Sequence, residues 1–217
     1  MVLVDSLHAA RSGLALLIST HSDMEVLAEA DSADAALEFL AGTRRRLGIV
    51  VLVSVGLRGD RDAFWLMRSI RERFPTMPIL AIGANVEEMT ISRALFAGAD
   101  GFLDKRSSPE EFVEAVRSSL GGEVVLSGVP IERLGDVAQG LDVEISDKQQ
   151  LTDREVEVMT VAAEGLTARQ IARRLGVSER TVTTHLQHIY QKLGVGNRVA
   201  ALGVAGRTRA FRSRPVE

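Results

Sequence analysis

Cysteine is absent from this 217-residue sequence, and aromatic side chains make up only 4% of it. Without cysteine the chain forms no disulfide bond and offers no thiolate for catalysis or metal binding, which fits a reducing compartment. Long hydrophobic runs and a signal-peptide pattern are also missing. Since a membrane span needs about 20 apolar residues in succession, we expect a cytoplasmic protein with no membrane partner.

Charge is unevenly distributed, although the formal net charge is only −3. Residues 151–217 contain 11 Lys and Arg against 6 Asp and Glu, whereas residues 1–150 contain 15 against 23. A basic C-terminal part joined to an acidic N-terminal part is the distribution expected when a nucleic-acid-binding module is attached to a module with another role.

Two helices separated by a tight turn are predicted near the C-terminal end. The first, Thr167 to Leu175, ends at Gly176, because glycine adopts the left-handed C-terminal conformation at low cost. Ser178 is a good N-cap for the second helix, which ends at Gly194. Apolar residues on the second helix recur at spacings of four, three and four and define one face: Val182, Leu186, Ile189 and Leu193.

The opposite face of this second helix is polar but nearly free of carboxylates. A surface helix shows the same amphipathicity, but it usually carries Glu and Lys on its outer side. Here Glu179 is the only acid between Ser178 and Leu193. Because phosphates repel carboxylates, this composition suits a helix that enters the major groove of DNA.

The region from Leu151 to Ala201 resembles the LuxR-type helix-turn-helix. The resemblance is carried by Leu151–Val158, Glu164–Thr167, Gln170–Ala172, Leu175–Ser178, Thr181–Val182, His185–Leu186 and Ile189–Val195. It implies four helices, namely one from about Asp153, a scaffold helix, a recognition helix, and a last one from about Arg198. Thr152 and Glu155 have the spacing of a capping box, which agrees with the start of the first helix.

The resemblance also assigns contacts with double-stranded DNA. Thr183, Thr184 and Gln187 occupy the positions that reach base edges. Gln187 can bond adenine bidentately, and a threonine methyl group can contact the methyl group of thymine. Other side chains are assigned to the phosphate backbone, where they set register rather than sequence: Thr167, Arg169, Gln170, Arg180, Thr181, His188, Lys192 and Arg198.

Strand-like and helix-like segments alternate five times over residues 1–120. The strand-like segments are Val2–Val4, Val26–Ala30, Ile49–Val53, Pro78–Ile82 and Gly101–Leu103. A helical pattern follows each of them, and the last begins with a Ser108 cap and Pro109 at its first position. We therefore predict an α/β domain with a five-stranded parallel sheet in flavodoxin-like order, followed by an all-α domain.

The α/β part resembles the receiver domain of bacterial response regulators, and the whole chain resembles a NarL/FixJ-type response regulator. A receiver needs a carboxylate cluster that holds Mg²⁺ and an aspartate that accepts a phosphoryl group. At the corresponding strand ends this sequence keeps one acid and the lysine but replaces the rest: Asp5 and Ser6 after the first strand, Ser54 or Val55 after the third, Gly83 after the fourth and Lys105 after the fifth.

The missing aspartate favours a degenerate receiver, retained for packing and dimerisation, in a regulator that works without phosphorylation. Two alternatives stay open. The vacated pocket could sense a small-molecule effector, or Ser54 could serve as a non-standard phosphoryl acceptor. We expect no cofactor, no metal site and no enzymatic activity, because His185 and His188 lack a third ligand and no nucleophile–base constellation is present.

The predicted domain organisation is a receiver at residues 1–121, a linker at 122–149 with a short helix over Ile131–Val137, and a DNA-binding domain at 150–217. The last domain ends in a basic tail from Gly206. We expect a homodimer, because one recognition helix reads too few base pairs for useful specificity. The last helix is the expected DNA-bound dimer contact, through Val199, Leu202 and Val204.

The resemblance further implies RNA polymerase as a partner. An arginine-rich, lysine-poor composition suggests a GC-rich bacterial genome. Regulators of this kind without the aspartate often serve secondary metabolism or development in such bacteria, which gives the expected biological setting.

Overall fold

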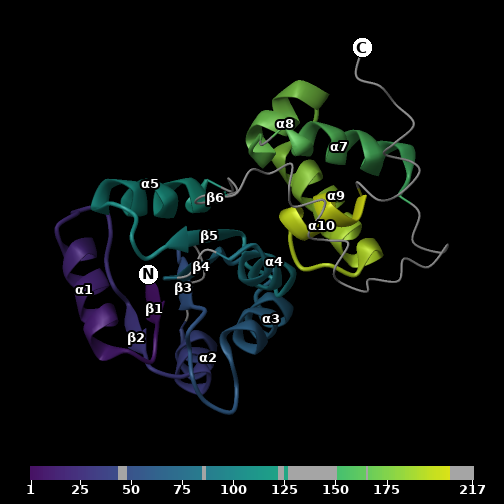
Figure 1. Cartoon of the computed structure of the whole chain (residues 1–217). Helices are drawn as coiled ribbons and strands as arrows, with labels where there is room; N and C mark the ends of the chain where they lie inside the picture. Colours follow the sequence, from purple (N-terminus) through teal and green to yellow (C-terminus); the bar gives the residue numbers. More distant parts are fainter. Residues whose placement is uncertain (44–47, 85–86, 122–124, 127–150, 165, 206–217) are drawn as a thin grey trace.

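The computed structural model describes residues 1–43, 48–84, 87–121, 125–126, 151–164 and 166–205. These residues form an α/β domain and a separate helical domain, and the predicted fold class is confirmed (Figure 1). The helix expected over Ile131–Val137 and the basic tail from Gly206 lie outside the described residues.

One sheet of six parallel strands forms the centre of the α/β domain, in the order β2-β1-β3-β4-β5-β6. The strands are β1 (Val2–Val4), β2 (Ala28–Ala30), β3 (Val51–Ser54), β4 (Ile79–Gly83), β5 (Gly101–Asp104) and β6 (Val125–Leu126). The first five follow the flavodoxin-like order predicted from the alternating pattern. Because every pair is parallel, the carboxyl ends of β1, β3, β4 and β5 lie at one edge of the sheet.

Helices cover both faces of this sheet (Figure 1). They are α1 (His8–Ser19), α2 (Ala33–Gly42), α3 (Ala63–Arg73), α4 (Glu88–Phe96) and α5 (Pro109–Leu120). Successive strand residues point to opposite faces, so Val51 and Val53 pack with residues of α2, α3 and α4, while Leu52 packs with residues of α1 and α5. The sheet is thus buried on both sides, as its continuous apolar strands require.

The sixth strand corrects the predicted linker boundary. Val125 and Leu126 lie within the segment assigned to the linker, yet they pair with Gly101 and Phe102 of β5. A two-residue strand carries too little periodicity to be found from sequence, because its pairing depends on where α5 returns the chain. Gly101 permits the approach, since a Cβ atom there would lie 2.5 Å from the Val125 carbonyl oxygen.

The helical domain consists of α7 (Asp153–Ala163), α8 (Ala168–Leu175), α9 (Glu179–Leu193) and α10 (Arg198–Ala205), close to the four helices that the resemblance implied. Side-chain caps fix where the first three of these helices begin. Thr152 forms a capping box with Glu155, Thr167 forms one with Gln170, and the Ser178 hydroxyl accepts a hydrogen bond from the Thr181 N–H. The two predicted glycine stops, Gly176 and Gly194, both have φ of +66°.

The domains touch where α4 and α10 pack together (Figure 1). Phe96, the last residue of α4, packs against the hydrophobic core of the helical domain. Of the residues expected at the DNA-bound dimer contact of α10, Val204 is fully buried in that core and Leu202 is half-buried against it, so the dimer contact stays a prediction in which Val204 has no exposed surface to contribute. The Val199 side chain lies outside the described part. Among the described helices, none is long and apolar enough to cross a membrane.

Replacing Gly101 with alanine should destabilise the α/β domain by about 1–3 kcal/mol, because the added methyl group collides with the Val125 carbonyl and a Leu80 methyl group. Urea unfolding followed through Trp65, the single tryptophan and a residue of α3, measures the effect. The matched control is Gly13→Ala on α1, where no atom lies within 4 Å of the new Cβ and a gain of about 0.5–1 kcal/mol is expected. An unchanged midpoint for Gly101→Ala would contradict the β5–β6 pairing.

Candidate nucleic-acid interface

Helix α9 has one buried face and one polar face that is open to solvent. The predicted apolar stripe is confirmed, since its four members are at most 9% exposed: Val182, Leu186, Ile189 and Leu193. On the other side Thr184, Gln187 and His188 are exposed and Thr183 is half-buried. The three residues expected to read bases therefore share the face that the core does not use.

Their hydrogen bonds determine what this face can offer a DNA base. The hydroxyl of Thr183 donates to the Glu179 carbonyl at 3.0 Å, and the hydroxyl of Thr184 donates to the Arg180 carbonyl at 2.9 Å. Their donor hydrogens are thus used within the helix, which leaves a methyl group and acceptor lone pairs. Gln187 makes no side-chain hydrogen bond to another described residue, so both halves of its amide are available. A free amide is what bidentate bonding to adenine requires.

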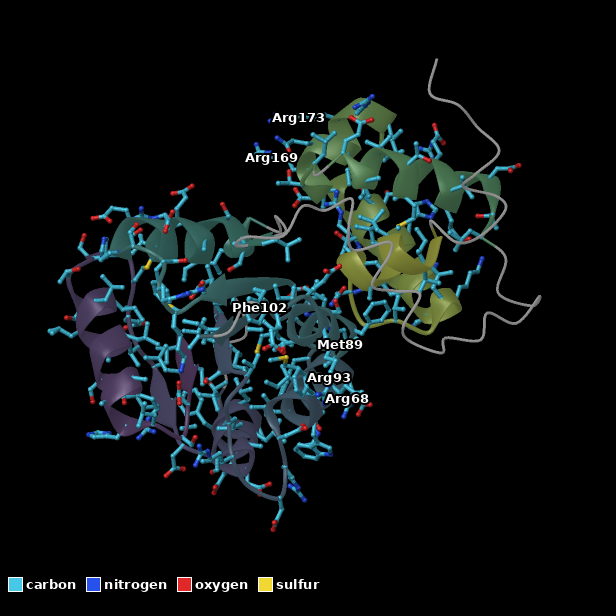
Figure 2. The ribbon with its side chains drawn as sticks, viewed as in Figure 1. Arg68, Met89, Arg93, Phe102, Arg169 and Arg173 are labelled. Atoms are coloured by element: carbon cyan, nitrogen blue, oxygen red, sulfur yellow. The ribbon has the colours of Figure 1, made fainter. Side chains whose placement is uncertain are left out.

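Unpaired arginines lie near this face. Arg169, Arg173 and Arg180 form no ion pair with any described residue, whereas neighbouring Arg154 and Arg174 are paired with Glu157 and Glu164. Figure 2 shows Arg169 and Arg173 side by side at the outer edge of α8. Sequence reasoning named Arg169 and Arg180 but missed Arg173, although its position four residues after Arg169 on a helix is a signal that could have found it.

The polar residues at the two helix starts serve as caps. Gln170 accepts a hydrogen bond from the Thr167 N–H at 2.7 Å, and the Thr181 hydroxyl bonds the Ser178 hydroxyl at 2.7 Å. These bonds fix the entry into α8 and α9. A phosphate contact by Thr167, Gln170, Thr181 or exposed His188 stays a prediction.

Arg198 was expected at a phosphate, and the structure contradicts this. The residue is only 8% exposed, and its guanidinium donates to the carbonyl oxygens of Leu166 and Ala162 near the C-terminal end of α7. A cation there meets the negative end of the α7 dipole. Burial lowers the pKa of Arg198, with a smaller opposing contribution from Tyr190.

Lys192, also expected at the DNA backbone, is engaged inside the domain. Its ammonium donates to Glu155 Oε2 at 2.6 Å, and Glu155 is only 4% exposed. Burial alone would raise the pKa of Glu155, but the Lys192 and Thr152 hydrogen bonds outweigh it and hold that pKa below its usual value. The main effect of Lys192 is therefore to tie α9 to α7, and a phosphate contact must compete with this pair.

Asn197 connects the helical domain to the α/β domain. Its buried side-chain amide donates to the carbonyl oxygens of Leu95 and Ala99, each at 2.6 Å, while its Oδ1 accepts the Ala200 N–H at 2.8 Å. We call the two cross-domain hydrogen bonds the Asn197 bridge. Nothing in the sequence singled out this residue, because its partners lie about 100 positions earlier.

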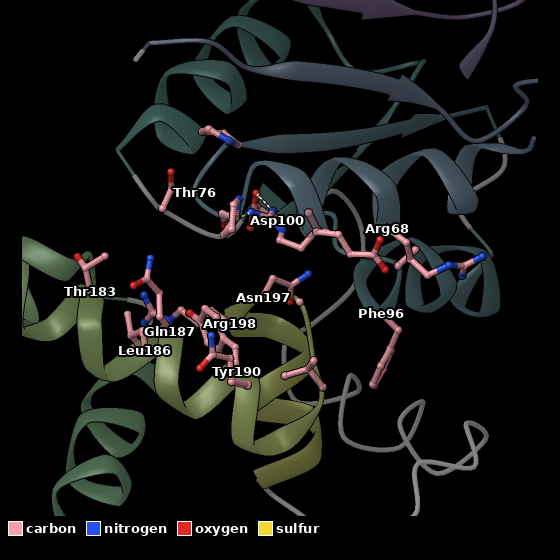
Figure 3. Close-up of a pocket in the computed structure, with 18 of the residues that line it drawn as sticks. Arg68, Thr76, Phe96, Asp100, Thr183, Leu186, Gln187, Tyr190, Asn197 and Arg198 are labelled. Atoms are coloured by element: carbon pink, nitrogen blue, oxygen red, sulfur yellow. Dashed lines mark hydrogen bonds and ion pairs between the residues drawn. The ribbon is translucent and has the colours of Figure 1, made fainter. Parts of the chain in front are cut away.

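A cavity of about 810 Å³ lies between the domains beside the Asn197 bridge, and we call it the interdomain cleft. Thr183 and Gln187 of α9 line it, opposite Thr76 of the α/β domain (Figure 3). A DNA duplex is far larger than this space. In the arrangement seen here, the base-reading face can enter a major groove only after the two domains move apart.

The carboxyl edge of the sheet holds the predicted receiver pocket. Asp5 is 4% exposed and forms an ion pair with Lys105 at 2.5 Å, and Ser54 hydrogen-bonds the same carboxylate. Burial raises the pKa of Asp5, but the bonds from Lys105, the Leu7 N–H and Ser54 together bring it below its usual value. Asp5 is thus an ionised carboxylate that already has its counter-ion.

The structure settles which residue ends the third strand. Ser54 is the last residue of β3 and faces Asp5, whereas Val55 packs against the hydrophobic core. Ser6 is exposed, and Gly83 ends β4 without a side chain to offer. Over the described residues there is no group of three or more His, Asp or Glu that could hold a metal ion.

Comparisons with known proteins agree with both domains. Residues 1–117 match the family model described as "Response regulator receiver domain", and residues 149–205 match "Bacterial regulatory proteins, luxR family". The chain is 30% identical over 213 residues to "Nitrate/nitrite response regulator protein NarL" of Escherichia coli strain K12, which covers 97% of this chain and 96% of the relative. It is 32% identical to "Uncharacterized transcriptional regulatory protein YhcZ" of Bacillus subtilis strain 168, over 93% of this chain and 92% of that protein.

Among solved structures, RcsB from Salmonella enterica serovar Typhimurium, bound to promoter P1flhDC in the presence of the phosphomimetic BeF3-, shares the fold. The TM-score is 0.52 at 22% identity, over 94% of this chain and 96% of that one.

The Asn197 bridge can be tested with Asn197→Asp. Aspartate keeps the oxygen that caps α10 but turns a carboxylate toward two carbonyl oxygens, at a cost of about 1–3 kcal/mol for each lost bond. We expect the domains to separate, seen as a larger radius of gyration in small-angle X-ray scattering with unchanged helix content. Gln191→Glu, which places the same charge in the same cleft without touching the bridge, should stay compact. Equal radii for the two variants would refute the bridge.

Proposed function

Because this chain belongs to the response regulators that join a receiver domain to a LuxR-type DNA-binding domain, we propose that it is a dimeric, sequence-specific transcription regulator that acts without phosphorylation. The observation that carries the proposal is the division of α9 into a buried apolar face and an exposed polar face on which Glu179 is the only carboxylate. Such a helix is held rigidly on one side and presents groups of base-edge size on the other.

DNA recognition is proposed through two sets of side chains. Gln187, Thr184 and Thr183 read base edges, and the unpaired arginines of α8 and α9 hold the phosphates. RcsB, which shares the fold, is described as bound to a promoter, and this supports the same use of the fold here. We add Arg173 to the residues proposed to contact the DNA phosphates, and we remove Arg198 from them because its side chain is buried.

Independence from phosphorylation is supported by the pocket at the sheet edge. Ser54 stands where the resemblance expects the acceptor carboxylate, and among the described residues Asp5 is the acid that contacts it. With Lys105 already paired to Asp5, the site lacks both the charge that holds Mg²⁺ and the nucleophile that forms an acyl phosphate. We assign the receiver a structural role, in which it packs against the DNA-binding domain and serves dimerisation.

A dimer is proposed because one α9 spans too few base pairs for specific binding. RcsB is described as forming dimers on DNA, which supports a two-fold arrangement here. RNA polymerase is the further partner that a transcription regulator requires. The three lysines against 23 arginines fit a GC-rich genome, and on that basis we place the regulator in secondary metabolism or development.

Phosphorylation independence is tested by incubating the full chain with acetyl phosphate and Mg²⁺, and separately with beryllofluoride and Mg²⁺. We expect no gain of mass and no change in sedimentation, because the pocket offers neither the acceptor nor a metal-binding acid cluster. A stoichiometric phosphoryl adduct that disappears in Ser54→Ala would instead establish Ser54 as an acceptor and overturn this part of the proposal.

DNA reading is tested by selecting genomic fragments with the purified protein and titrating variants on a selected site. Gln187→Ala should relax preference at one adenine by about 1–3 kcal/mol, because the bidentate amide is lost. Arg169→Ala should weaken binding to all sequences alike and reduce the slope of log affinity against log salt by about 1.

Arg174→Ala is the matched control for these titrations. It removes the same charge from α8, but its guanidinium is already paired with Glu164, so the salt slope should change less than in Arg169→Ala. Unaltered sequence preference in Gln187→Ala would reject the assigned reading face.

A further inference from the structure

The interdomain cleft has the size of a small-molecule site. At about 810 Å³ it lies within the range of about 300–1,000 Å³ typical of ligand pockets. Its walls come from two domains that are separate in sequence, with α3 and the end of α4 on one side and α9 and the start of α10 on the other (Figure 3). It is distinct from the vacated receiver pocket, which lies at the carboxyl edge of the sheet.

The cleft borders a buried positive charge that has no counter-ion among the described residues. Arg198 lines the cleft and is only 8% exposed, yet no carboxylate of the described residues lies within 4 Å of it. Its terminal nitrogens donate to main-chain carbonyls, and its Nε–H has no hydrogen-bond partner in the described part of the chain. A buried cation held only by neutral dipoles is costly, so the cleft favours an anion.

The other charged groups of the cleft nearly cancel. Arg71 forms an ion pair with Asp100 at 2.6 Å. Arg68 and Glu72, which lie one turn apart on α3, are exposed and form no ion pair with a described residue. The charge of Arg198 is therefore the unbalanced one. Arg68 lies toward the other end of the cleft from Tyr190 and Arg198 (Figure 3).

Apolar groups and the Tyr190 hydroxyl complete the site. Phe96, Pro75 and Val195 give it hydrophobic surface, and the ring of Tyr190 adds more. The Tyr190 hydroxyl makes no hydrogen bond to another described residue. Burial raises the pKa of Tyr190, so its hydroxyl stays protonated and can donate to an anion.

We propose that the interdomain cleft binds an amphipathic organic anion, with its apolar body against Phe96, Pro75 and Val195 and its negative group beside Tyr190 and Arg198, which lie next to each other (Figure 3). The ligand class is an aromatic or aliphatic molecule with one carboxylate, sulfonate or comparable group. This site gives the regulator an input that the receiver pocket does not provide.

The location of the site determines the effect of the ligand. A molecule that contacts both domains binds the closed arrangement of the domains better than the open one. It therefore shifts the equilibrium toward the closed arrangement, by an amount set by the difference between the two affinities. Since Thr183 and Gln187 line the same cleft, the closed form cannot read bases. The ligand therefore lowers DNA affinity, a consequence that rests on the proposed function, whereas the binding site itself does not.

The test uses 8-anilinonaphthalene-1-sulfonate as the probe, with the full chain and no DNA present. Fluorescence titration and calorimetry should show one saturable site per chain. N-phenyl-1-naphthylamine is an analogue without the sulfonate. Its dissociation constant should be higher than that of the anionic probe by about tenfold or more. Tyr190→Phe should weaken binding of the anionic probe about tenfold, because its hydroxyl no longer donates to the sulfonate. Arg68→Ala removes a cation at the other end of the cleft and should change probe affinity much less.

Arg73→Ala is the matched control, since Arg73 is an exposed arginine on the same helix outside the cleft, and it should leave probe affinity unchanged. Asn197→Asp, which opens the domains, should abolish the site while near-UV circular dichroism shows that both domains stay packed. Binding that is non-saturable, equal for the uncharged analogue, or insensitive to Tyr190→Phe would overturn the proposal.

DNA affinity is measured separately, with and without the probe. Loss of DNA binding in every condition would refute the proposed function while leaving the ligand site intact. Saturable probe binding with unchanged DNA affinity would refute only the coupling between them.

Discussion

The relation between the two domains depends on one buried amide. Asn197 uses both hydrogens of its side-chain nitrogen on carbonyl oxygens at the end of α4 and just after it, and its oxygen caps α10. An unpaired buried amide is expensive, so the same side chain that starts α10 also fixes where α4 must lie. Close backbone contact supports this arrangement, because a Cβ atom at Gly196 would lie 2.9 Å from Arg71 Cγ and 3.5 Å from Gly98 Cα. The cleft, and the position of Thr183 and Gln187 along it, follow from that placement.

Local patterns predicted most of the fold. Capping boxes, glycine stops and hydrophobic periodicity are short-range signals, and they located the helices from Thr152 to Gly194 and five of the strands. They could not show β6, whose two residues pair only because α5 delivers them to the β5 edge. They could not show the Asn197 bridge either, since hydrogen bonds across about 100 residues leave no periodicity.

The site was predicted less completely than the fold, for a physical reason. In a sequence, a cation on the polar side of a helix looks free to meet phosphate, but tertiary packing decides whether it is. Lys192 is bound to the nearly buried Glu155, and Arg198 turns inward to the carbonyls at the end of α7. Arg169 and Arg173, by contrast, have no such partner among the described residues. Only the folded domain separates cations that hold the protein together from those left for DNA.

The receiver pocket and the cleft differ in how their buried charges are balanced. In a pocket with an acid cluster, adding a phosphoryl group changes the local charge and thereby shifts the fold between states. Here Asp5 and Lys105 neutralise each other and Ser54 completes their contacts, so that edge of the sheet has no unbalanced charge left to respond. The unbalanced buried charge among the described residues lies instead at Arg198, beside the contact that holds the domains together. A regulator responds where its free energy differs between states, and the input proposed for this protein therefore acts between the domains rather than inside the receiver.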